Sequence, residues 1–408
     1  MQYCGGMGST LTPSERPVVC HLIETLLHGG AEAAVHGLAL GSRAAGYDVV
    51  VCCFVPGPVV EQLERAGIAV EVLNLRRPSV LSVVSFVRYV WHAYAGLTRV
   101  LRERHVTLIH AHLPDSIMWA VIVGSLRGIP VVATYHGPQM MPKGRGPLDP
   151  RNSFRRAAYR LAHRVCRRTI AVSEAIRDLL SHEYGFARER TILIPNPVNT
   201  AAFAAQPPDA GLRHTLGLDG CRVLICVGRL VPGKGQRHLV DALAKLSPKY
   251  RDVRLVLVGD GPERAALGRQ IEQRGLSDRV LLLGGRNDVP ALLALSDVFV
   301  LPTFSEGLPI SVVEAMAAAA PVVVTAIPGN LEVVGDERHG KLVPVGDSAA
   351  LAAAIASLLD DPVGAREMGR RGQAWVRHRF DLPAVVSRTA ALYTEVLGGE
   401  RHVHSPAA

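Results

Sequence analysis

Short runs of apolar and β-branched residues alternate with longer segments of helical periodicity along most of the chain. The first run is VVCHLIE at Val18–Glu24, and later ones read VVVCCF, TLIHAH, PVVATY, TIAVS and TILIP. Apolar strands separated by helices are typical of βαβ units, whose parallel sheet is covered on both faces. The first half of the chain is therefore predicted to form a doubly wound α/β domain.

The alternation pauses near residues 197–210, where Pro, Gly and small residues concentrate as they do in linkers. A second series of runs follows, RVLICVG, VRLVLVG, RVLLLG, DVFVLP and PVVVTA, and it predicts a second doubly wound domain. We expect a leader at 1–17, a first Rossmann-like domain at 18–200, and a second at 201–380. Residues 381–398 are expected to form a helix, and the sequence leaves open whether it crosses back to the first domain.

Ligands of such sheets bind outside the carboxyl ends of the strands, and two facing domains place the default site between them. Gly29 and Gly30 follow the first predicted strand, where paired glycines allow the backbone to approach a phosphate or a sugar closely. A tight turn without a ligand explains the same glycines. The GxGxxG pattern is missing at this turn, which disfavours an NAD-dependent dehydrogenase.

Two basic residues follow the first strand of the second domain. Arg229 lies just beyond the strand, and Lys234 lies between Gly233 and Gly235, close to a predicted helix start. Two cations, flexible glycines and helix amides suit a diphosphate without a metal, whereas the alternative is two solvated residues on a loop. The loop is not a Walker A motif, because that motif requires Ser or Thr after the lysine.

The stretch SEGLPISVVEAMA contains two glutamates, Glu306 and Glu314. A strand is predicted to end at Pro302, and the first turn of the next helix is predicted to include Pro309. Glu314 then lies roughly 7.5 Å along that helix, so both carboxylates can reach one site. Carboxylates accept hydrogen bonds from vicinal hydroxyls, so a ribose and a sugar are suitable partners. Alternatively, Glu306 complements the helix start and Glu314 is solvated.

Composition and charge narrow the classes of partner. The hydrophobic content of 48% with 20% charged residues is typical of a globular protein, and the most apolar helical stretch is interrupted by Arg88. The seven cysteines show no CxxC pair, which favours reduced thiols in a cytosol over a zinc site. Of the net charge of +9, +8 belongs to residues 1–200. An acidic partner is therefore a nucleotide, an anionic acceptor or a membrane surface.

The combination of motifs resembles the GT4 glycosyltransferases, which are retaining enzymes of the GT-B fold. The second half is similar in VGRLVPGKG, VLVGDGPE and above all EGLPISVVEAMAAAAPVV. The first half is similar in GGAE, TLIHAH, VVATYHG, AVSEAIRDLL and IPNPVN. The last of these has Pro197 and Asn199 where the family often has Gly and Asp, which weakens the assignment of a hinge there.

The resemblance implies that 18–200 is the acceptor-side domain and that 201–380 is the nucleotide-sugar-binding domain. It also implies roles for individual residues. Arg229 and Lys234 match residues that hold the donor diphosphate, and Gly30 matches the loop glycine that closes over the phosphates. Glu314 matches the residue that holds the nucleotide ribose. Glu306 matches the residue that contacts the hydroxyls of the donor sugar.

Other matches lie near the transferred sugar. The backbone amides of Gly307 and Leu308 are similarly placed for phosphate or sugar. His136 matches a histidine beside the transferred sugar, although a structural histidine at a strand end is the alternative. His110 and His112 alternate on one strand and are interpreted as structural.

The resemblance implies an NDP-sugar donor, with UDP favoured over GDP, and transfer of a hexose or N-acetylhexosamine with retention. No metal or other cofactor is expected, since a DxD pair is missing and Arg229 and Lys234 supply positive charge. The acceptor is a hydroxyl of a glycan, a lipid-linked sugar or a small molecule, and nucleic acid is not expected as a partner. The alternatives are a sugar-nucleotide epimerase or hydrolase of similar fold and a non-catalytic binding protein.

The acceptor is expected to contact loops around 138–150 and an arginine-rich helix at 151–168. This helix has seven arginines and no acidic residue, with Arg156, Arg160 and Arg164 at helical spacing. A basic amphipathic helix suits an anionic membrane surface or an acidic acceptor, and a solvated face is the equal alternative. We expect a cytoplasmic protein, with peripheral contact to the inner face of the membrane as an option.

Overall fold

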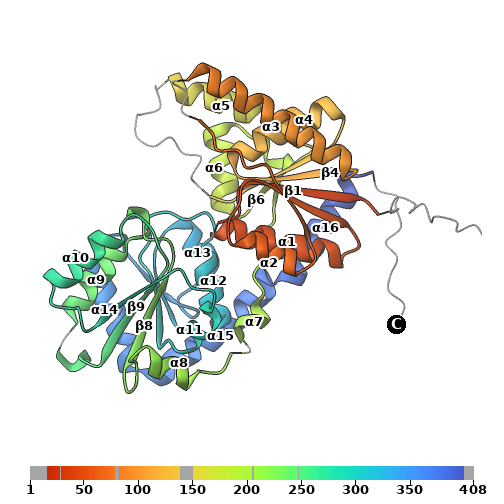
Figure 1. The fold of residues 1–408 in the computed structure, drawn as a ribbon. Coiled ribbons are helices and arrows are strands. Elements are labelled where there is room, and N and C mark those ends of the chain that lie inside the picture. Colours follow the sequence, from red (N-terminus) through yellow and green to blue (C-terminus); the bar gives the residue numbers. More distant parts are fainter. Residues whose placement is uncertain are drawn as a thin grey trace, which may run out of the picture.

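The computed structural model describes residues 16–27, 29–78, 82–137, 150–204, 206–246 and 248–398. Nearly all of the expected leader and of the expected acceptor loop at 138–150 lies outside these residues. The described chain forms two α/β domains, which confirms the predicted fold class (Figure 1).

The first domain is built on a parallel sheet of seven described strands in the order β3-β2-β1-β4-β5-β6-β7. Its central strands β4 and β5 are buried along their whole length, because helices cover both faces. The strands are β1 Val18–Thr25, β2 Asp48–Val55, β3 Ala69–Val72, β4 Leu108–His112, β5 Val131–Tyr135, β6 Arg168–Ala171 and β7 Thr191–Leu193. The helices are α1 Gly30–Ala44, α2 Val59–Arg65, α3 Val83–Glu103, α4 Pro114–Arg127, α5 Pro150–Val165 and α6 Glu174–Tyr184.

The second domain has six described parallel strands in the order β10-β9-β8-β11-β12-β13. The strands are β8 Arg222–Val227, β9 Val253–Val258, β10 Val280–Gly284, β11 Val298–Leu301, β12 Val322–Thr325 and β13 Lys341–Val343. The helices are α7 Thr200–Ala204, α8 Ala210–Thr215, α9 Gln236–Lys245, α10 Arg264–Gln273, α11 Val289–Ala294, α12 Ile310–Ala317, α13 Pro328–Val334, α14 Ser348–Asp360 and α15 Pro362–Phe380.

The chain passes between the domains twice, at neighbouring points. Going out, the amide of Val198 donates to the carbonyl of Phe380 (2.9 Å), and the Thr200 hydroxyl donates to the Asp381 carboxylate (2.7 Å). On the return, α16 (Leu382–Val396) lies against α1 of the first domain. Its Tyr393 is fully buried in the core of that domain. The first domain is therefore completed by the end of the chain (Figure 1).

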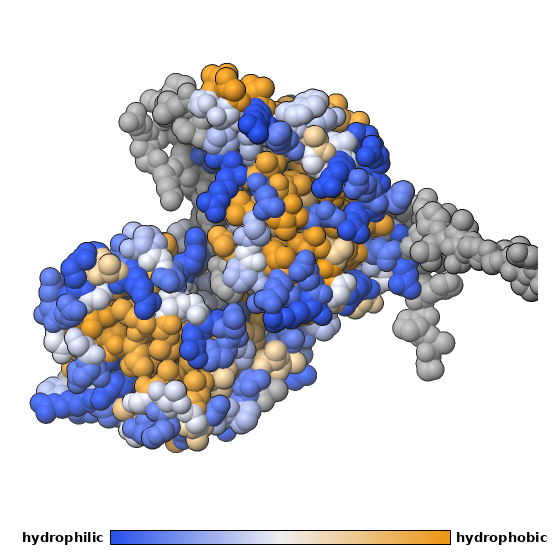
Figure 2. Space-filling view, in the orientation of Figure 1, coloured by the Kyte–Doolittle hydropathy of each residue, from blue (hydrophilic) through white to orange (hydrophobic). Residues whose placement is uncertain are grey.

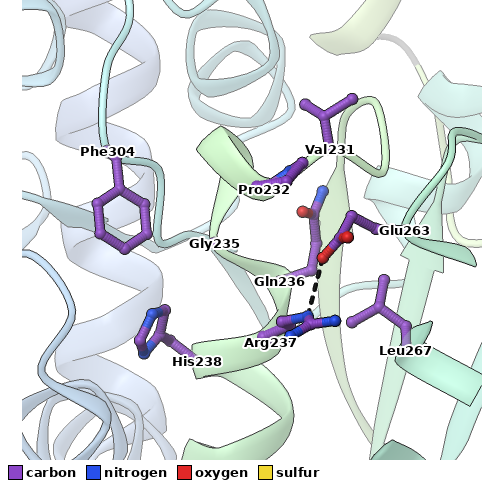
Figure 3. A pocket seen from close by; sticks show the side chains of 9 residues that line it. All are labelled: Val231, Pro232, Gly235, Gln236, Arg237, His238, Glu263, Leu267 and Phe304. Atoms are coloured by element: carbon purple, nitrogen blue, oxygen red, sulfur yellow. Dashed lines mark ion pairs between the residues drawn. The ribbon is translucent and has the colours of Figure 1, made fainter. Parts of the chain in front are cut away.

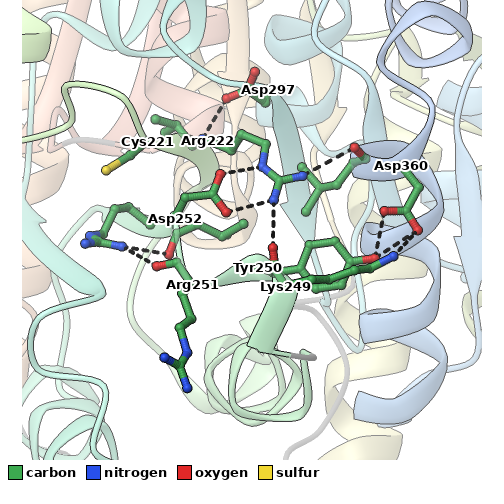
Figure 4. Close-up of polar contacts among 12 residues, drawn as sticks. Cys221, Arg222, Lys249, Tyr250, Arg251, Asp252, Asp297 and Asp360 are labelled. Carbon is green, nitrogen blue, oxygen red and sulfur yellow. Dashed lines mark hydrogen bonds and ion pairs between the residues drawn. The ribbon is translucent and has the colours of Figure 1, made fainter.

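A polar network at the amino end of the second sheet joins β8, the segment before β9 and α14 (Figure 4). The guanidinium of Arg222 at the start of β8 donates to both carboxylate oxygens of Asp252, over 2.6 and 2.8 Å. The Tyr250 hydroxyl donates to Asp360 at the end of α14 (2.9 Å). The bidentate pairing of Arg222 with Asp252 fixes geometry as well as charge. The bond from Tyr250 to Asp360 then ties α14 to this end of the sheet.

No single helix in the described ranges is long and apolar enough to cross a membrane. Only α14 and α15 taken together meet that criterion, and the two are bent by 103° at their junction.

Candidate active site

The predicted site residues gather where the strand order of each sheet reverses. In the first sheet the order reverses between β1 and β4, and Gly29 and Gly30 follow β1. In the second sheet it reverses between β8 and β11, with Arg229 after β8 and Glu306 after β11. Such switch points leave a crevice outside the carboxyl ends of the strands, where ligands of open α/β sheets bind.

The starts of α1 and α12 face one another across the domain junction. A methyl group on Gly30 would lie 3.2 Å from Cδ1 of Ile310, the first residue of α12. Pro309 is the capping residue before α12, not part of its first turn as predicted. Two helix amino ends directed at one place create a region suited to an anion.

Lys234 and Glu306 form an ion pair, with 2.5 Å between Nζ and Oε1. The two side chains are only 21% and 11% exposed. The loop that holds Lys234 is fitted to the end of β11: the Phe304 amide donates to the Gly233 carbonyl (2.9 Å), and a Cβ on Gly235 would lie 2.0 Å from the Pro302 carbonyl oxygen. Close backbone packing therefore places a cation beside a carboxylate at the junction.

Arg229 is exposed at the end of β8. Its guanidinium makes no hydrogen bond or ion pair with the residues that the structure describes, whereas its carbonyl accepts from the Gln236 side chain (3.0 Å). This side chain can therefore bind an anion without first breaking an internal contact.

Glu314 is the fifth residue of α12 and is partly buried. Its carboxyl group has no hydrogen-bond partner or cation within the described ranges, and burial raises its pKa to about 7. A carboxyl group that titrates near neutrality is a frequent property of functional sites.

Gly307 packs closely against the backbone of the first domain. A Cβ at this position would lie 2.3 Å from the carbonyl oxygen of His136 and 2.6 Å from Cα of Gly137. The buried hydroxyl of Ser173, which caps α6, donates to the Gly307 carbonyl (2.7 Å). Leu308 follows as a buried residue. The segment after Glu306 is thus held by the first domain, and the sequence analysis missed Ser173.

His136 follows β5 and is part of a hydrogen-bonded row of side chains. Its Nε2 lies 3.0 Å from Nδ1 of His112, and its Nδ1 lies 2.8 Å from Oδ1 of Asn196. Burial lowers the pKa of His136 to about 4, so the ring is neutral at pH 7. Sequence reasoning did not identify Asn196, whose position in IPNPVN carried no chemical signal of its own.

Three buried histidines, His21, His110 and His112, have ring nitrogens within 4.8 Å of one another, a spacing that a metal ion could bridge. Hydrogen bonds account for this proximity. His21 Nδ1 lies 3.1 Å from His112 Nε2, and both nitrogens of His110 are occupied, by Tyr393 at 2.5 Å and Thr134 at 2.6 Å. His110 and His112 are thus integrated into the sheet core.

A cavity of about 210 Å³ lies beside the Lys234 loop, between the starts of α9 and α10 (Figure 3). Arg237 and Glu263 form an ion pair in its wall (2.8 Å), and Phe304 stands on the opposite side. No feature of the sequence pointed to this cavity.

Two facing Rossmann-like domains, each a doubly wound parallel sheet, are the architecture of the GT-B fold. The sequence pattern described as Glycosyltransferase Family 4 matches residues 28–202, and that described as Glycosyl transferases group 1 matches residues 213–375. The chain belongs to this family, the group 1 or GT4 glycosyltransferases.

Relatives of known activity extend over most of the chain. The 2-deoxystreptamine glucosyltransferase of Streptomyces kanamyceticus is 30% identical over 75% of this chain and 83% of its own length. An Escherichia coli galactosyltransferase that uses UDP-Gal and α-D-GlcNAc-diphosphoundecaprenol is 26% identical over 86% of this chain and 90% of its own. Anabaena HepE, solved with UDP and glucose, superimposes with a TM-score of 0.81 at 27% identity, covering 93% of this chain and 100% of HepE.

Proposed function

We propose that this glycosyltransferase moves a hexose or N-acetylhexosamine from a UDP-sugar to an acceptor hydroxyl with retention of configuration. The observation that carries the proposal is the placement of Lys234 and Glu306 as a shielded ion pair at the domain junction. Arg229 and Glu314 lie on the same carboxyl-end side of the second sheet. The UDP and glucose bound by HepE support a uridine nucleotide over a guanosine nucleotide.

In the proposed donor site, some residues compensate the charge of the diphosphate and others form hydrogen bonds with the ribose and the sugar. Arg229 and Lys234 compensate the diphosphate, assisted by the amino ends of α1 and α12 and by the amides of Gly307 and Leu308. Glu314 accepts hydrogen bonds from the ribose, and Glu306 accepts them from the donor sugar. In this proposal the two cations provide the positive charge for the leaving diphosphate, so that transfer requires no metal ion.

The proposed step breaks the bond between the anomeric carbon and the diphosphate oxygen. The acceptor oxygen forms its bond on the same face of the sugar, and the acceptor proton passes to the departing phosphate. Positive charge develops on the sugar during this step, and in this proposal the Glu306 carboxylate stabilises that charge. Glu306 is thus a charge-stabilising group and not a nucleophile.

An array of UDP- and GDP-sugars with candidate acceptors, read by mass spectrometry, tests the proposal. We expect a glycosylated product and UDP release only when donor and acceptor are both present. UDP release that does not depend on acceptor would indicate a hydrolase. Conversion of the donor sugar without UDP release would indicate an epimerase, and binding without turnover a non-catalytic protein.

The raised pKa of Glu314 predicts a pH-dependent affinity for the donor. Only the ionised carboxylate can accept from both ribose hydroxyls, and with a pKa of about 7 it becomes ionised as the pH rises through that value. Between pH 6 and pH 8 the affinity for UDP-glucose, whose diphosphate does not titrate in this range, should increase by about tenfold. Calorimetric titration measures this change. In Glu314→Gln the increase should vanish, and an unchanged increase would exclude Glu314 as its source.

The proposed acceptor is a hydroxyl of a glycan, a lipid-linked sugar or a small molecule. This class is broad because the relatives named above are a 2-deoxystreptamine glucosyltransferase and a galactosyltransferase that uses a diphosphoundecaprenol-linked sugar.

We infer a cytoplasmic enzyme that makes peripheral contact with anionic membrane. Arg156 and Arg160 contribute less to this contact than the sequence predicts, since Arg156 pairs with Glu183 (2.9 Å) and Arg160 donates to the Tyr184 carbonyl (2.7 Å).

The stronger support for membrane contact is an apolar surface on three neighbouring helices, visible over the start of α3 at the upper end of Figure 2. Along α3, Val83, Val87 and Trp91 repeat at a spacing of four residues, which places them on one face, and the exposed Arg88 borders them. An apolar stripe beside basic residues is typical of helices that lie on anionic lipid. The exposed apolar residues on α3, α4 and α5 are Val83, Val84, Val87, Val90, Trp91, Ile122, Leu126, Leu161 and Val165.

Val84→Asp should reduce binding to vesicles that contain anionic lipid. Val84 is 81% exposed, so the substitution leaves the fold unchanged while placing a charge in the apolar surface on α3. Val363→Asp is the matched control, because Val363 is 69% exposed on α15 in the second domain. Vesicle co-sedimentation should show loss of binding for Val84→Asp alone. Equal binding by both variants and the unmodified chain would remove α3 from the contact.

A further inference from the structure

Four side chains form a continuous hydrogen-bonded row across the carboxyl ends of the first sheet. His21 on β1 contacts His112 on β4 (3.1 Å), His112 contacts His136 after β5 (3.0 Å), and His136 contacts Asn196 after β7 (2.8 Å). His21, His112 and Asn196 are at most 3% exposed, and His136 is the member with the most solvent contact. The row therefore runs from the core to the residue that meets Gly307 at the domain junction.

The hydrogen bonds of a row of neutral imidazoles must all point in one direction, because each ring has one donor and one acceptor nitrogen. In one direction, each Nδ1–H donates and Asn196 Oδ1 accepts the last bond. His21 Nε2, which is buried and has no partner among the described residues, is then left as a bare acceptor. The opposite direction would place an N–H there instead. An unpaired buried N–H is rarer in proteins than an unpaired acceptor, so the first direction is favoured.

Burial keeps the members of the row neutral. It lowers the pKa of His21 to about 3 and that of His136 to about 4, and it lowers the pKa of His112 well below the ordinary value. The described histidines that interact electrostatically with His136 are His110 and His112. Across the junction, Gly307 is preceded by Glu306, whose charge is already paired with Lys234.

We propose that His112, supported by His21, and Asn196 are positioning residues that hold the His136 ring in a single neutral tautomer, with Nδ1 protonated. This inference rests on the proposed function in that it assigns His136 to the donor-sugar side of the site. Both ring nitrogens of His136 are engaged by the protein. The ring therefore serves as a fixed uncharged surface beside the sugar and neither gives nor takes a proton.

The test uses the full chain with ¹⁵N-labelled histidine and two variants at one position. Asn at position 112 can place an amide N–H near the position of His112 Nδ1, whereas Leu cannot donate at all. In the unmodified protein and in His112→Asn, NMR should show His136 as the neutral Nδ1–H tautomer from pH 8 to pH 5. In His112→Leu, the Nε2 of His136 loses its hydrogen-bond donor while the ring stays buried. The ring should remain neutral, but its Nε2 resonance should move to that of an acceptor nitrogen without a hydrogen bond.

Kinetics give a second result. His112→Leu should lower kcat by about tenfold or more, as loss of an orienting partner does at other sites, with little change in the donor KM. His112→Asn should retain most of the activity. Equal kcat values for the Leu variant and the unmodified protein would overturn the positioning role.

Two outcomes with the unmodified protein would also overturn the inference, even if the Leu variant fails to fold. The first is a His136 ring in the Nε2–H form or titrating between pH 5 and 8. The second is stoichiometric binding of added Zn²⁺ by His21 and His112, because the metal would take the lone pair that accepts the hydrogen bond of the row. The NMR result does not depend on turnover, so failure of the proposed function would remove only the kinetic comparison.

Discussion

Glu306→Gln and Lys234→Ala should each lower the kcat of sugar transfer by at least about 10² to 10³, the typical effect of removing one preorganised charge-stabilising group. Glu306→Gln keeps the shape of the side chain but removes the negative charge that faces the developing positive charge on the sugar. Lys234→Ala removes a cation for the leaving diphosphate and leaves Glu306, which is 11% exposed, without its partner. Steady-state assays with a UDP-sugar measure both effects.

A second lysine in an ion pair provides the control for these variants. Lys249 pairs with Asp360 over 2.9 Å at the amino end of the second sheet and is 59% exposed. Lys249→Ala should therefore leave transfer close to that of the unmodified protein. Circular dichroism and thermal unfolding confirm that all variants are folded. Near-normal transfer by either Glu306→Gln or Lys234→Ala would show that the pair lies outside the chemistry.

Gly307→Ala should prevent the two domains from meeting as they do in this structure. The added methyl group would lie 2.3 Å from the His136 carbonyl oxygen and 2.6 Å from Cα of Gly137, and neither backbone atom can move aside as a flexible side chain does. Misplacement of about 1 Å at a reaction site can cost about 10² in rate, so we expect a loss of at least that size.

Small-angle scattering should detect the more open arrangement of Gly307→Ala as a larger radius of gyration. Gly268→Ala is the matched control, because a methyl group at Gly268 on α10 meets no atom within 4 Å. If Gly307→Ala keeps both the compact scattering profile and the rate, the close contact is not required for catalysis.

The sequence predicted those parts of the fold and site that depend on local patterns. Apolar runs between helical segments identified both parallel sheets, since buried strands carry no polar alternation. The order of Arg229, Lys234, Glu306 and Glu314 placed the donor residues on loops after strands or at a helix start, and the structure brings Lys234 and Glu306 into contact. Their roles with a bound donor remain predictions.

Features that depend on pairing between distant segments were not predictable. The hydrogen bond from Ser173 to Gly307 joins residues 134 positions apart, and no pattern in the sequence predicts such a contact. Within the row from His21 to Asn196, the sequence singled out His112 and His136 separately but did not join them. His21 gave only a weak signal, a histidine within the apolar run VVCHLIE. The start of α12 was predicted one residue too early, at Pro309 instead of Ile310. Proline is as compatible with the capping position as with the first turn, so the sequence did not distinguish the two.

The return of α16 to the first domain has a consequence for engineering. Because Tyr393 fills the core beside α1, and Tyr47 donates to the Ala390 carbonyl (3.1 Å), the first domain is discontinuous in sequence. A chimera that joins the first 200 residues to the donor half of a related enzyme would lack its matching closing helix. Exchange of acceptor specificity between family members should therefore transfer residues 382–396 together with the amino-terminal half.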